Sequence, residues 1–183
     1  MTQNPFVTAY VGLGANLGDA PGQLAAAAQC LTLLPQTEVI ALSHLYRSGA
    51  IEVDAPQPDY YNAVAALRTQ LDAEALLAAL LALEARFGRI RTGYHSPRTL
   101  DLDLLLYGNE RYCLPHLTVP HPRLHQRAFV LLPLLELAPD LTAPGLGRLL
   151  DYLPAVAAQP ITRIAPLAAP ESTRLQPIEA LAQ

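Results

Sequence analysis

Two aspartates, Asp101 and Asp103, occupy alternate positions in the segment RTLDLDLLL at residues 98–106. Alternate side chains of a β-strand point to the same face of the sheet, so the two carboxylates lie together with their Cβ atoms roughly 7 Å apart. At an effective dielectric constant of about 20, carboxylates at that separation repel by about 2 kcal/mol. A magnesium ion offsets this repulsion, because Mg²⁺ prefers carboxylate oxygens and completes its octahedron with substrate phosphates. We therefore expect Asp101 and Asp103 to bind metal; the alternative is two surface acids on a solvated face.

Arginines lie close to this acidic pair: Arg89, Arg91 and Arg98 precede it in one loop and at the start of the strand. The planar guanidinium group makes bidentate, charge-assisted hydrogen bonds to phosphate oxygens. Acids and arginines side by side indicate a metal-bridged polyphosphate, with Arg91 and Arg98 as phosphate ligands. The alternative is that the arginines only favour the C-terminal dipole of the preceding helix, and we prefer that role for Arg86.

A second cluster, VPHPRLHQRAF at residues 119–129, contributes His121, Arg127 and Phe129. Imidazole and guanidinium groups donate hydrogen bonds to phosphate, and a phenyl ring offers a flat surface to a heterocycle. A zinc site built from His116, His121 and His125 is the alternative, but it lacks the H-E-x-x-H pattern and a partnering cysteine. We expect His116 and His125 to be ordinary surface residues.

A third cluster, PDYYNAV at residues 58–64, places Tyr60 and Asn62 on one face of a predicted strand. Asparagine pairs a donor with an acceptor and can read the edge of a heterocycle, whereas tyrosine can stack on its plane. The segment GLGANLG, residues 12–18, follows a predicted strand, but its G-x-G-x-x-x-G spacing and the missing ribose-binding acid argue against a dinucleotide loop. We interpret it as a structural turn.

The composition excludes several classes of function. The 183 residues carry a net charge of −4, which gives no general electrostatic reason to bind nucleic acid. All 12 basic residues are arginine, so a P-loop and Schiff-base chemistry, which both need lysine, are excluded. Cys30 and Cys113 are interpreted as buried thiols of a reducing compartment. The chain shows no signal-peptide pattern, and its longest helical apolar run, residues 75–83, is too short to span a bilayer, so we expect a cytoplasmic protein.

Hydrophobic periodicity predicts two helices with Asp19 and Asp72 as N-caps, and a third helical stretch over residues 123–137 that Pro133 kinks or restarts. Strands are predicted at residues 8–12, 39–46, 60–69 and 99–108, with a short partner for the last at 111–114. The buried face of the acidic strand is expected to carry Leu100, Leu102, Leu104 and Leu106. This order indicates an α+β domain over residues 1–153 with a mostly antiparallel sheet. Residues 154–183, rich in proline and alanine, are expected to be an appended C-terminal tail.

Taken together, these segments resemble the family of 6-hydroxymethyl-7,8-dihydropterin pyrophosphokinases of folate biosynthesis. The matching segments cover about residues 8–153 in the family's order: YVGLGANLGD, PDYYNAVAAL, LEARFGRIR, SPRTLDLDLLLYG and LTVPHPRLHQRAFVLLPLLELAPDL. The resemblance implies a ferredoxin-like fold with helices on both faces of the sheet. It also implies transfer of a diphosphate from ATP to the hydroxymethyl group of the pterin, with release of AMP. We expect a monomer that acts on these small molecules and binds neither nucleic acid nor membranes.

The resemblance also assigns roles by motif position. Asp101 and Asp103 would bind two Mg²⁺ ions and, with Arg91 and Arg98, form the catalytic set. The phosphates of the co-substrate ATP would be held by Arg89, Arg91, Arg98, His121 and Arg127. The pterin ring would lie between Tyr60 and Phe129 with Asn62 at its edge, and Glu84 falls where the family carries an acid near the adenosine site.

Three segments depart from the family pattern. Leu81 replaces a polar residue, Tyr94-His95-Ser96 stands where many members have Trp-Gly, and Ser48-Gly49-Ala50 stands where Thr-x-Pro is common. We expect these changes to affect loop closure and rate more than the type of reaction. Two alternatives stay open: a catalytically silent relative that binds pterin or nucleotide, and a nicotinamide-dependent oxidoreductase.

Overall fold

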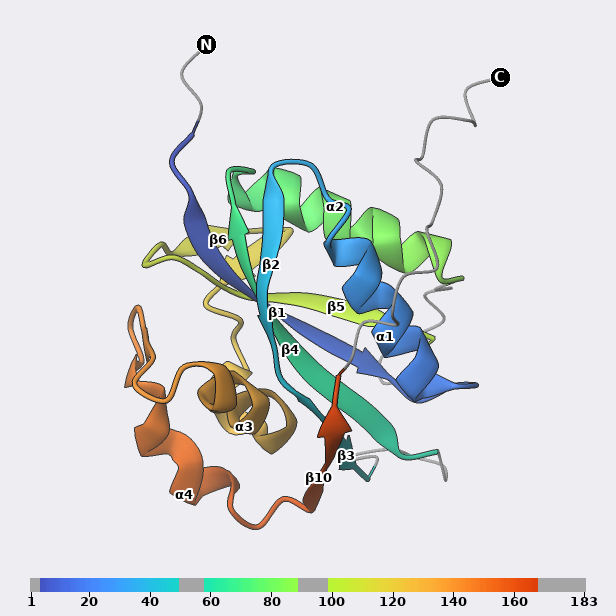
Figure 1. The fold of residues 1–183 in the computed structure, drawn as a ribbon. Helices are drawn as coiled ribbons and strands as arrows, with labels where there is room; N and C mark the ends of the chain where they lie inside the picture. The colour runs from blue at the N-terminus through green and yellow to red at the C-terminus, as the bar shows by residue number, and fades with distance from the viewer. Residues whose placement is uncertain (1–3, 50–57, 89–98, 168–183) are drawn as a thin grey trace.

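The structure, a computed structural model, describes residues 4–49, 58–88 and 99–167, which form a six-stranded antiparallel sheet with helices on both faces (Figure 1). The strands follow the order β10-β3-β4-β1-β5, and β2 pairs with the C-terminal half of β4. The predicted α+β fold is confirmed. The elements are β1 (Val7–Ala15), α1 (Ala20–Leu31), β2 (Thr37–Leu42), β3 (His44–Ser48), β4 (Tyr60–Thr69), α2 (Ala73–Arg86), β5 (Asp101–Tyr107), β6 (Tyr112–Leu114), β7 (Leu117–Val119), the 3₁₀ turn η1 (Leu124–Gln126), α3 (Ala128–Leu137), β8 (Thr142–Ala143), β9 (Gly147–Arg148), the 3₁₀ turn η2 (Leu149–Tyr152), α4 (Leu153–Val156) and β10 (Ile161–Pro166).

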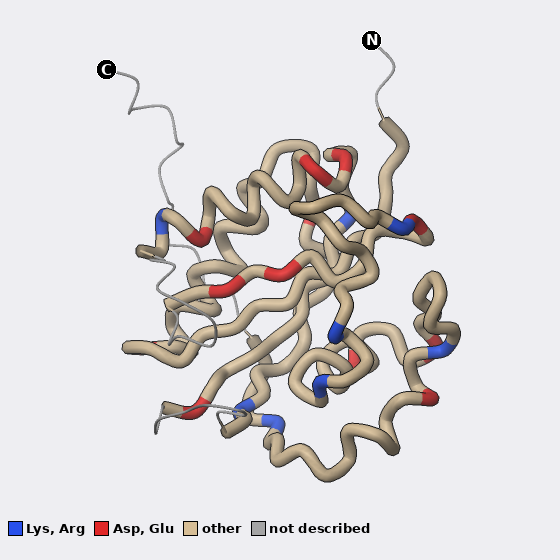
Figure 2. The backbone as a smooth tube through the Cα atoms, turned by 180° about the vertical axis from the view of Figure 1, so that it is seen from behind, with Lys and Arg blue, Asp and Glu red and all other residues tan. Residues whose placement is uncertain are grey.

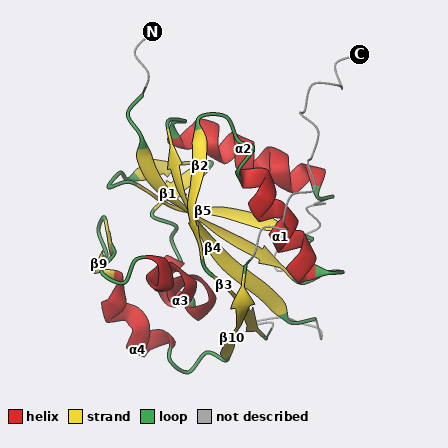
Figure 3. Cartoon of the chain, in the orientation of Figure 1, coloured by secondary structure: helices red, strands yellow, loops and turns green. Residues whose placement is uncertain are grey.

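Helices cover both faces of the sheet (Figure 3), and the buried apolar residues form a layer on each face. On one face, α1 and α2 pack against alternate residues of β1 from Ala9 to Ala15. On the other face, α3 packs against Val64 and the C-terminal part of β5, and α4 packs against α3. Within the described part of the chain, no helix combines the length and apolarity that crossing a bilayer requires. Acidic and basic residues are interspersed along the described backbone (Figure 2).

Both predicted N-caps are confirmed. The Asp19 carboxylate accepts a 3.1 Å hydrogen bond from the Gly22 N–H, and the Asp72 carboxylate accepts a 2.8 Å bond from the Ala75 N–H. Each cap satisfies a backbone donor that the first turn of a helix leaves without an intrahelical partner. These local contacts fix where α1 and α2 begin, and therefore how they lie on the sheet.

A β-bulge in β5 changes which leucines face which layer. Tyr10 of β1 pairs with Leu106 and Val11 pairs with Leu104, so Leu105 is an extra residue. Leu102 and Leu104 lie in the α1/α2 layer, whereas Leu105 and Leu106 both lie in the α3 layer. The prediction that Leu106 shares the face of Leu104 is therefore wrong, because a bulge reverses the alternation of side chains beyond it.

Two other local predictions need correction. The strand β6 pairs with β7 rather than with β5, although Gly108 makes the expected turn with a φ of 51°. The predicted helix from residue 123 begins as the 3₁₀ turn η1, and α3 itself starts at Ala128. Pro133 lies inside α3, which continues to Leu137.

Residues 154–167 pack on the domain, although the sequence predicts a tail from residue 154. Val156 of α4 and Leu167 after β10 are buried, and β10 pairs with β3 at the edge of the sheet. Most side chains of β10 are exposed, so this strand lacks the alternation that announces a half-buried strand. The boundary at residue 154 therefore falls inside packed structure.

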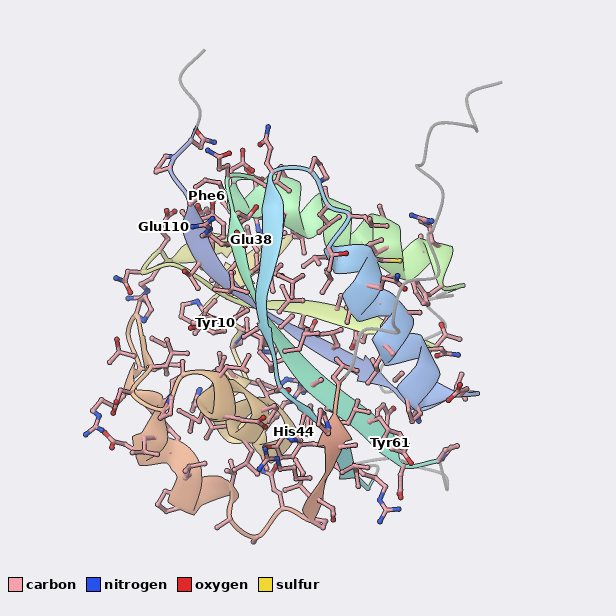
Figure 4. All side chains as sticks on the ribbon, viewed as in Figure 1. Phe6, Tyr10, Glu38, His44, Tyr61 and Glu110 are labelled. Carbon is pink, nitrogen blue, oxygen red and sulfur yellow. The ribbon has the colours of Figure 1, made fainter. Side chains whose placement is uncertain are left out.

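A polar cluster around Glu136 joins α3 to the same edge of the sheet, where His44 lies (Figure 4). The Glu136 carboxylate accepts hydrogen bonds from the His44 N–H at 3.1 Å, from His44 Nδ1 at 2.5 Å and from the Tyr46 hydroxyl at 2.7 Å. Burial alone would raise the pKa of Glu136, but the bonds from Tyr46 and His44 outweigh it and hold that pKa below its ordinary value. Burial and the bond to Glu136 raise the pKa of Tyr46 to about 12. Arg163 of β10 lies 3.5 Å from the same carboxylate.

We expect a chain that ends at residue 160 to be less stable than one that ends at residue 167. The shorter chain loses β10, the burial of Leu167 and the Arg163–Glu136 contact, whereas the longer one keeps every contact described above. Burial of one leucine contributes about 2 kcal/mol, which corresponds to a loss of about 4–8 °C in Tm for a domain of this size. Calorimetric melting of both chains measures the difference, and equal Tm values would show that β10 does not stabilise the domain.

Candidate active site

The three central strands place the predicted polar residues in two rows across the sheet. In the first row, Asn62 of β4, Gly14 of β1 and Asp101 of β5 lie opposite one another. In the second row, Val64, Gly12 and Asp103 do the same. Neighbouring strands lie about 4.8 Å apart, so Asn62 and Asp101 are separated by roughly 10 Å across the sheet.

Glycine in the middle of each row leaves the floor between these side chains open. A Cβ atom at Gly14 would lie 3.2 Å from Asn62 Oδ1 and 4.0 Å from Asp101 Cβ. The sequence interpretation of residues 12–18 as a turn is corrected here, because β1 continues to Ala15 and only Gly18 of these glycines has a positive φ, 61°. The signal that could have shown this is the spacing of Gly12 and Gly14, which matches the spacing of the two aspartates.

A pocket of about 240 Å³ lies between this floor and the start of α3. It brings together six predicted site residues from β4, β5 and the junction of η1 with α3. These residues are Tyr60, Asn62, Asp101, Asp103, Arg127 and Phe129. Arg123, Gln126 and Gln159, which sequence reasoning did not select, line the pocket as well.

Asn62 is buried and its amide is oriented by a neighbour on β3. Its Nδ2 donates a 3.3 Å hydrogen bond to the hydroxyl of Ser48, which is also buried. Ser48 is the last residue of β3 and pairs with Tyr60 and Ile161, so it belongs to the sheet rather than to a loop. A short hydroxyl side chain at this position therefore sets the orientation of the amide at the edge of the pocket.

Arg127 and Phe129 both line the pocket, and in the sequence they flank Ala128, the first residue of α3. The guanidinium carbon of Arg127 lies 5.5 Å from the centre of the Phe129 ring, which is a cation–π distance. Arg127 has extended backbone dihedrals, with φ −125° and ψ 115°, so the chain changes direction there before the helix begins. A guanidinium group and a flat ring are thereby placed side by side.

His121 lies beside the pocket and is not among the residues that line it. Its N–H donates to the Leu105 carbonyl at 2.9 Å, and its Nδ1 accepts a 3.2 Å hydrogen bond from the Arg123 N–H. Burial, followed by the positive charges of Arg127 and Arg123, lowers the pKa of His121 to about 4. The ring is therefore neutral at pH 7, and because Nδ1 is an acceptor, Nε2 carries the proton and is the available donor.

Glu84 is placed apart from the other predicted residues. Its side chain is 2% exposed and accepts a 2.7 Å hydrogen bond from the Leu102 N–H, which ties α2 to β5. It does not line the pocket. A part in adenosine binding stays a prediction. The predicted Arg89, Arg91 and Arg98, and the departing segment Tyr94-His95-Ser96, lie outside the described residues.

The donor set on β5 fits magnesium. Asp101 and Asp103 are half-buried side chains on one face of the strand, and the open floor over Gly14 lies beside them. No group of three or more His, Cys, Asp or Glu side chains is placed to hold a metal within residues 4–49, 58–88 and 99–167. Magnesium needs only one or two carboxylates when substrate phosphates supply the remaining ligands.

Comparison with known proteins agrees with this geometry. The model of the family 7,8-dihydro-6-hydroxymethylpterin-pyrophosphokinase matches residues 10–139. The 2-amino-4-hydroxy-6-hydroxymethyldihydropteridine pyrophosphokinase of Synechocystis is 46% identical over 145 residues, which are 79% of this chain and 73% of that protein. The enzyme of the same name from Pseudomonas aeruginosa is 45% identical over 155 residues, 85% of this chain and 95% of that one.

Solved structures show the same fold. A crystal structure of Plasmodium falciparum HPPK-DHPS with pterin and p-hydrobenzoate superposes with a TM-score of 0.63 and 14% sequence identity. The superposition covers 83% of this chain and 44% of that longer one. The family model matches residues 10–139, and both sequence relatives are pyrophosphokinases of the hydroxymethyl dihydropterin. The chain therefore belongs to the 7,8-dihydro-6-hydroxymethylpterin-pyrophosphokinase family.

Proposed function

We propose that the pocket between the central strands and α3 is the active site of a pyrophosphokinase. The chain is an ATP-dependent diphosphotransferase of folate biosynthesis, which transfers diphosphate to the hydroxymethyl group of 6-hydroxymethyl-7,8-dihydropterin and releases AMP. The observation that carries the site assignment is the row Asn62–Gly14–Asp101. It sets the Asn62 amide, which is proposed to recognise a heterocycle, and Asp101, which is proposed to bind metal, on one floor with open space between them.

The acidic end of the row is proposed to hold the phosphates of ATP. Asp101 and Asp103 would bind two Mg²⁺ ions, whose charge, when they are bound, stabilises the negative charge that develops on the transferred group. Arg127 lines the pocket at the start of α3, and it is proposed to bind the phosphates together with the Nε2–H of His121, which lies beside the pocket. The predicted ligands Arg89, Arg91 and Arg98 belong to this proposal, and Glu84 is proposed to contact the adenosine.

The other end of the row is proposed to bind the pterin. The Asn62 amide, held by Ser48, keeps hydrogen-bonding capacity for the edge of a heterocycle. Tyr60 and Phe129 line the same pocket and offer flat surfaces for the ring. Because the proposed site is built from one chain, we propose that the enzyme acts as a monomer.

The proposed mechanism depends on positioning and charge. The hydroxymethyl oxygen attacks the β-phosphorus of ATP, the bond from that phosphorus to the α–β bridging oxygen breaks, and AMP leaves while the hydroxyl proton passes to solvent. Such transfers are accelerated by in-line alignment and by neutralisation of charge on the phosphoryl oxygens. The rigid three-strand floor supplies the alignment, and the basic residues opposite it supply part of the neutralisation.

We expect ATP and 6-hydroxymethyl-7,8-dihydropterin to yield AMP and the pterin diphosphate in equal amounts, without ADP. Phosphorus NMR identifies the products.

Asp101→Asn and Asp103→Asn should each reduce turnover by about 10²–10³-fold, because several kcal/mol of metal-borne charge stabilisation is lost. Circular dichroism verifies the fold of each variant.

The control for these variants is Glu38→Gln, which neutralises an exposed acid on β2 that pairs with Arg68 away from the pocket. It should keep wild-type turnover. Near-normal turnover in a folded Asp101→Asn protein would refute the metal assignment. Production of ADP would indicate an ordinary kinase, and no consumption of ATP by the wild type would indicate a catalytically silent relative.

We expect Gly14→Ala to weaken pterin binding more than Gly12→Ala does. A methyl group at Gly14 would press on Asn62 Oδ1 at 3.2 Å, whereas one at Gly12 would meet the Leu105 side chain at 3.5 Å, an ordinary van der Waals distance. Displacing a buried amide from its partners costs about 1–3 kcal/mol, so the pterin Kd should rise roughly tenfold or more. Calorimetric titration with pterin measures both variants, and equal effects at the two positions would contradict the proposed role of Gly14.

We expect the stability of the free enzyme to fall as the pH is lowered from 7 toward 4. The pKa of His121 is lowered to about 4 in the folded protein, against about 6.5 for an unperturbed imidazole. The unfolded chain therefore takes up the proton first, and the contribution that is present above pH about 6.5 is lost as the pH falls through the folded pKa. Melting curves of the wild type and of His121→Asn, whose Oδ1 replaces the Nδ1 acceptor, should diverge over this range. His116→Gln, at an exposed histidine, is the control and should follow the wild type.

A further inference from the structure

Gln159 lies outside every segment that the sequence marked as functional, yet its side chain lines the pocket. It sits between α4 and β10, in the region predicted to be a tail. Its Oε1 accepts a 2.8 Å hydrogen bond from the Ala128 N–H, and its Nε2 donates a 2.8 Å bond to the Gln126 carbonyl. One amide therefore bonds both backbone groups that flank Arg127.

The start of α3 depends on this amide. Arg127 is the N-cap residue of α3, and its own side chain makes no capping hydrogen bond. The first backbone donors of a helix have no intrahelical partner and need one from elsewhere. The Ala128 N–H finds that partner in Gln159, 31 residues further along the chain.

Gln159 is itself firmly placed. Its N–H donates to the Val156 carbonyl at 3.0 Å, at the end of α4. Two residues later, Ile161 pairs with Ser48, the residue that orients the Asn62 amide. The amide of Gln159 therefore projects from a corner that is fixed on both sides.

We propose that Gln159 is a positioning residue that fixes the direction in which Arg127 and Phe129 enter the active site. Arg127 and Phe129 are adjacent to the two backbone groups that Gln159 bonds, and they are proposed to contact different substrates, the nucleotide and the pterin. Small displacements matter at such a site, because an error of about 1 Å in alignment can reduce a rate by roughly 10²-fold. Gln159 thus links the positions of Arg127 and Phe129, and through them both substrates, to the strand β10. The proposal rests on the proposed function of the pocket.

The experiment uses Gln159→Met, which keeps the length of the side chain and removes both hydrogen bonds. The matched control is Gln70→Met, because the Gln70 amide also donates to a backbone carbonyl, that of Asn4 at 2.7 Å, and does not line the pocket. Tm, the Kd for MgATP by calorimetry, and the KM for each substrate are measured for both variants. Because two hydrogen bonds are lost, we expect the Kd for MgATP and both KM values to rise about tenfold in Gln159→Met. They should stay at wild-type values in Gln70→Met.

A double-mutant cycle separates positioning from general stabilisation. In an Arg127→Ala background, Gln159→Met should add less than about twofold to the Kd for MgATP, since the group it positions is gone. Independent, additive effects in the cycle would overturn the proposal, as would a lowered Tm with unchanged Kd and KM. If Gln159→Met does not fold, Gln159→Glu keeps the acceptor for Ala128, loses the donor to Gln126, and enters the same cycle.

The MgATP measurements also separate this proposal from the proposed function. A wild type that binds MgATP but does not modify the pterin would contradict the proposed function, whereas the cycle between Gln159 and Arg127 would still be measurable. A wild type that converts the pterin normally, together with a Gln159→Met protein of unchanged Kd and KM, would contradict the positioning role alone.

Discussion

The hydrogen-bond register of β1 with its two neighbours is the constraint on which the site depends. It sets Gly14 between Asn62 and Asp101, and Gly12 between Val64 and Asp103. A slip of one residue would turn every side chain of β1 to the opposite face and place Leu13 where the open floor now lies. The apolar residues of β1 that pack under α1 and α2 oppose such a slip, because it would expose them. The core on one face of the sheet therefore fixes the register that places Gly14 between Asn62 and Asp101 on the other face.

Features that depend on neighbouring residues could be predicted from the sequence, and features that depend on distant partners could not. The caps Asp19 and Asp72 and the alternation of Asp101 and Asp103 are local, so their patterns are visible in a few residues. The bulge at Leu105 is defined by the pairing of β5 with β1, and no residue type in β5 indicates it. The strand β10 pairs with β3, and the side chain of Gln159 bonds backbone groups on both sides of Arg127. The residues of β10 are mostly exposed and Gln159 is an ordinary polar residue, so no local pattern in the sequence indicates either contact.

The carboxylate side chains of this protein have different roles because their surroundings differ. Glu84 and Glu136 both accept hydrogen bonds from backbone N–H groups of the sheet, and so join α2 and α3 to β5 and β3. Groups of this kind stabilise a fold, since they satisfy backbone donors away from water. Asp101 and Asp103 instead border the open floor, where charge can meet a ligand. The surroundings of an acid, more than its presence in a motif, indicate what it does.

The late position of β10 and Gln159 in the chain has a consequence for synthesis on the ribosome. During synthesis a chain emerges from the ribosome with its N-terminal end first. The floor of the pocket, made by β1, β4 and β5, and the helix α3 all emerge before Gln159 and the strand that anchors it. Until then the Ala128 N–H lacks its partner and the edge of β3 is uncovered. A nascent chain therefore contains β1, β4 and β5 early, but it gains the Gln159 contacts at the start of α3 only after α4 has emerged.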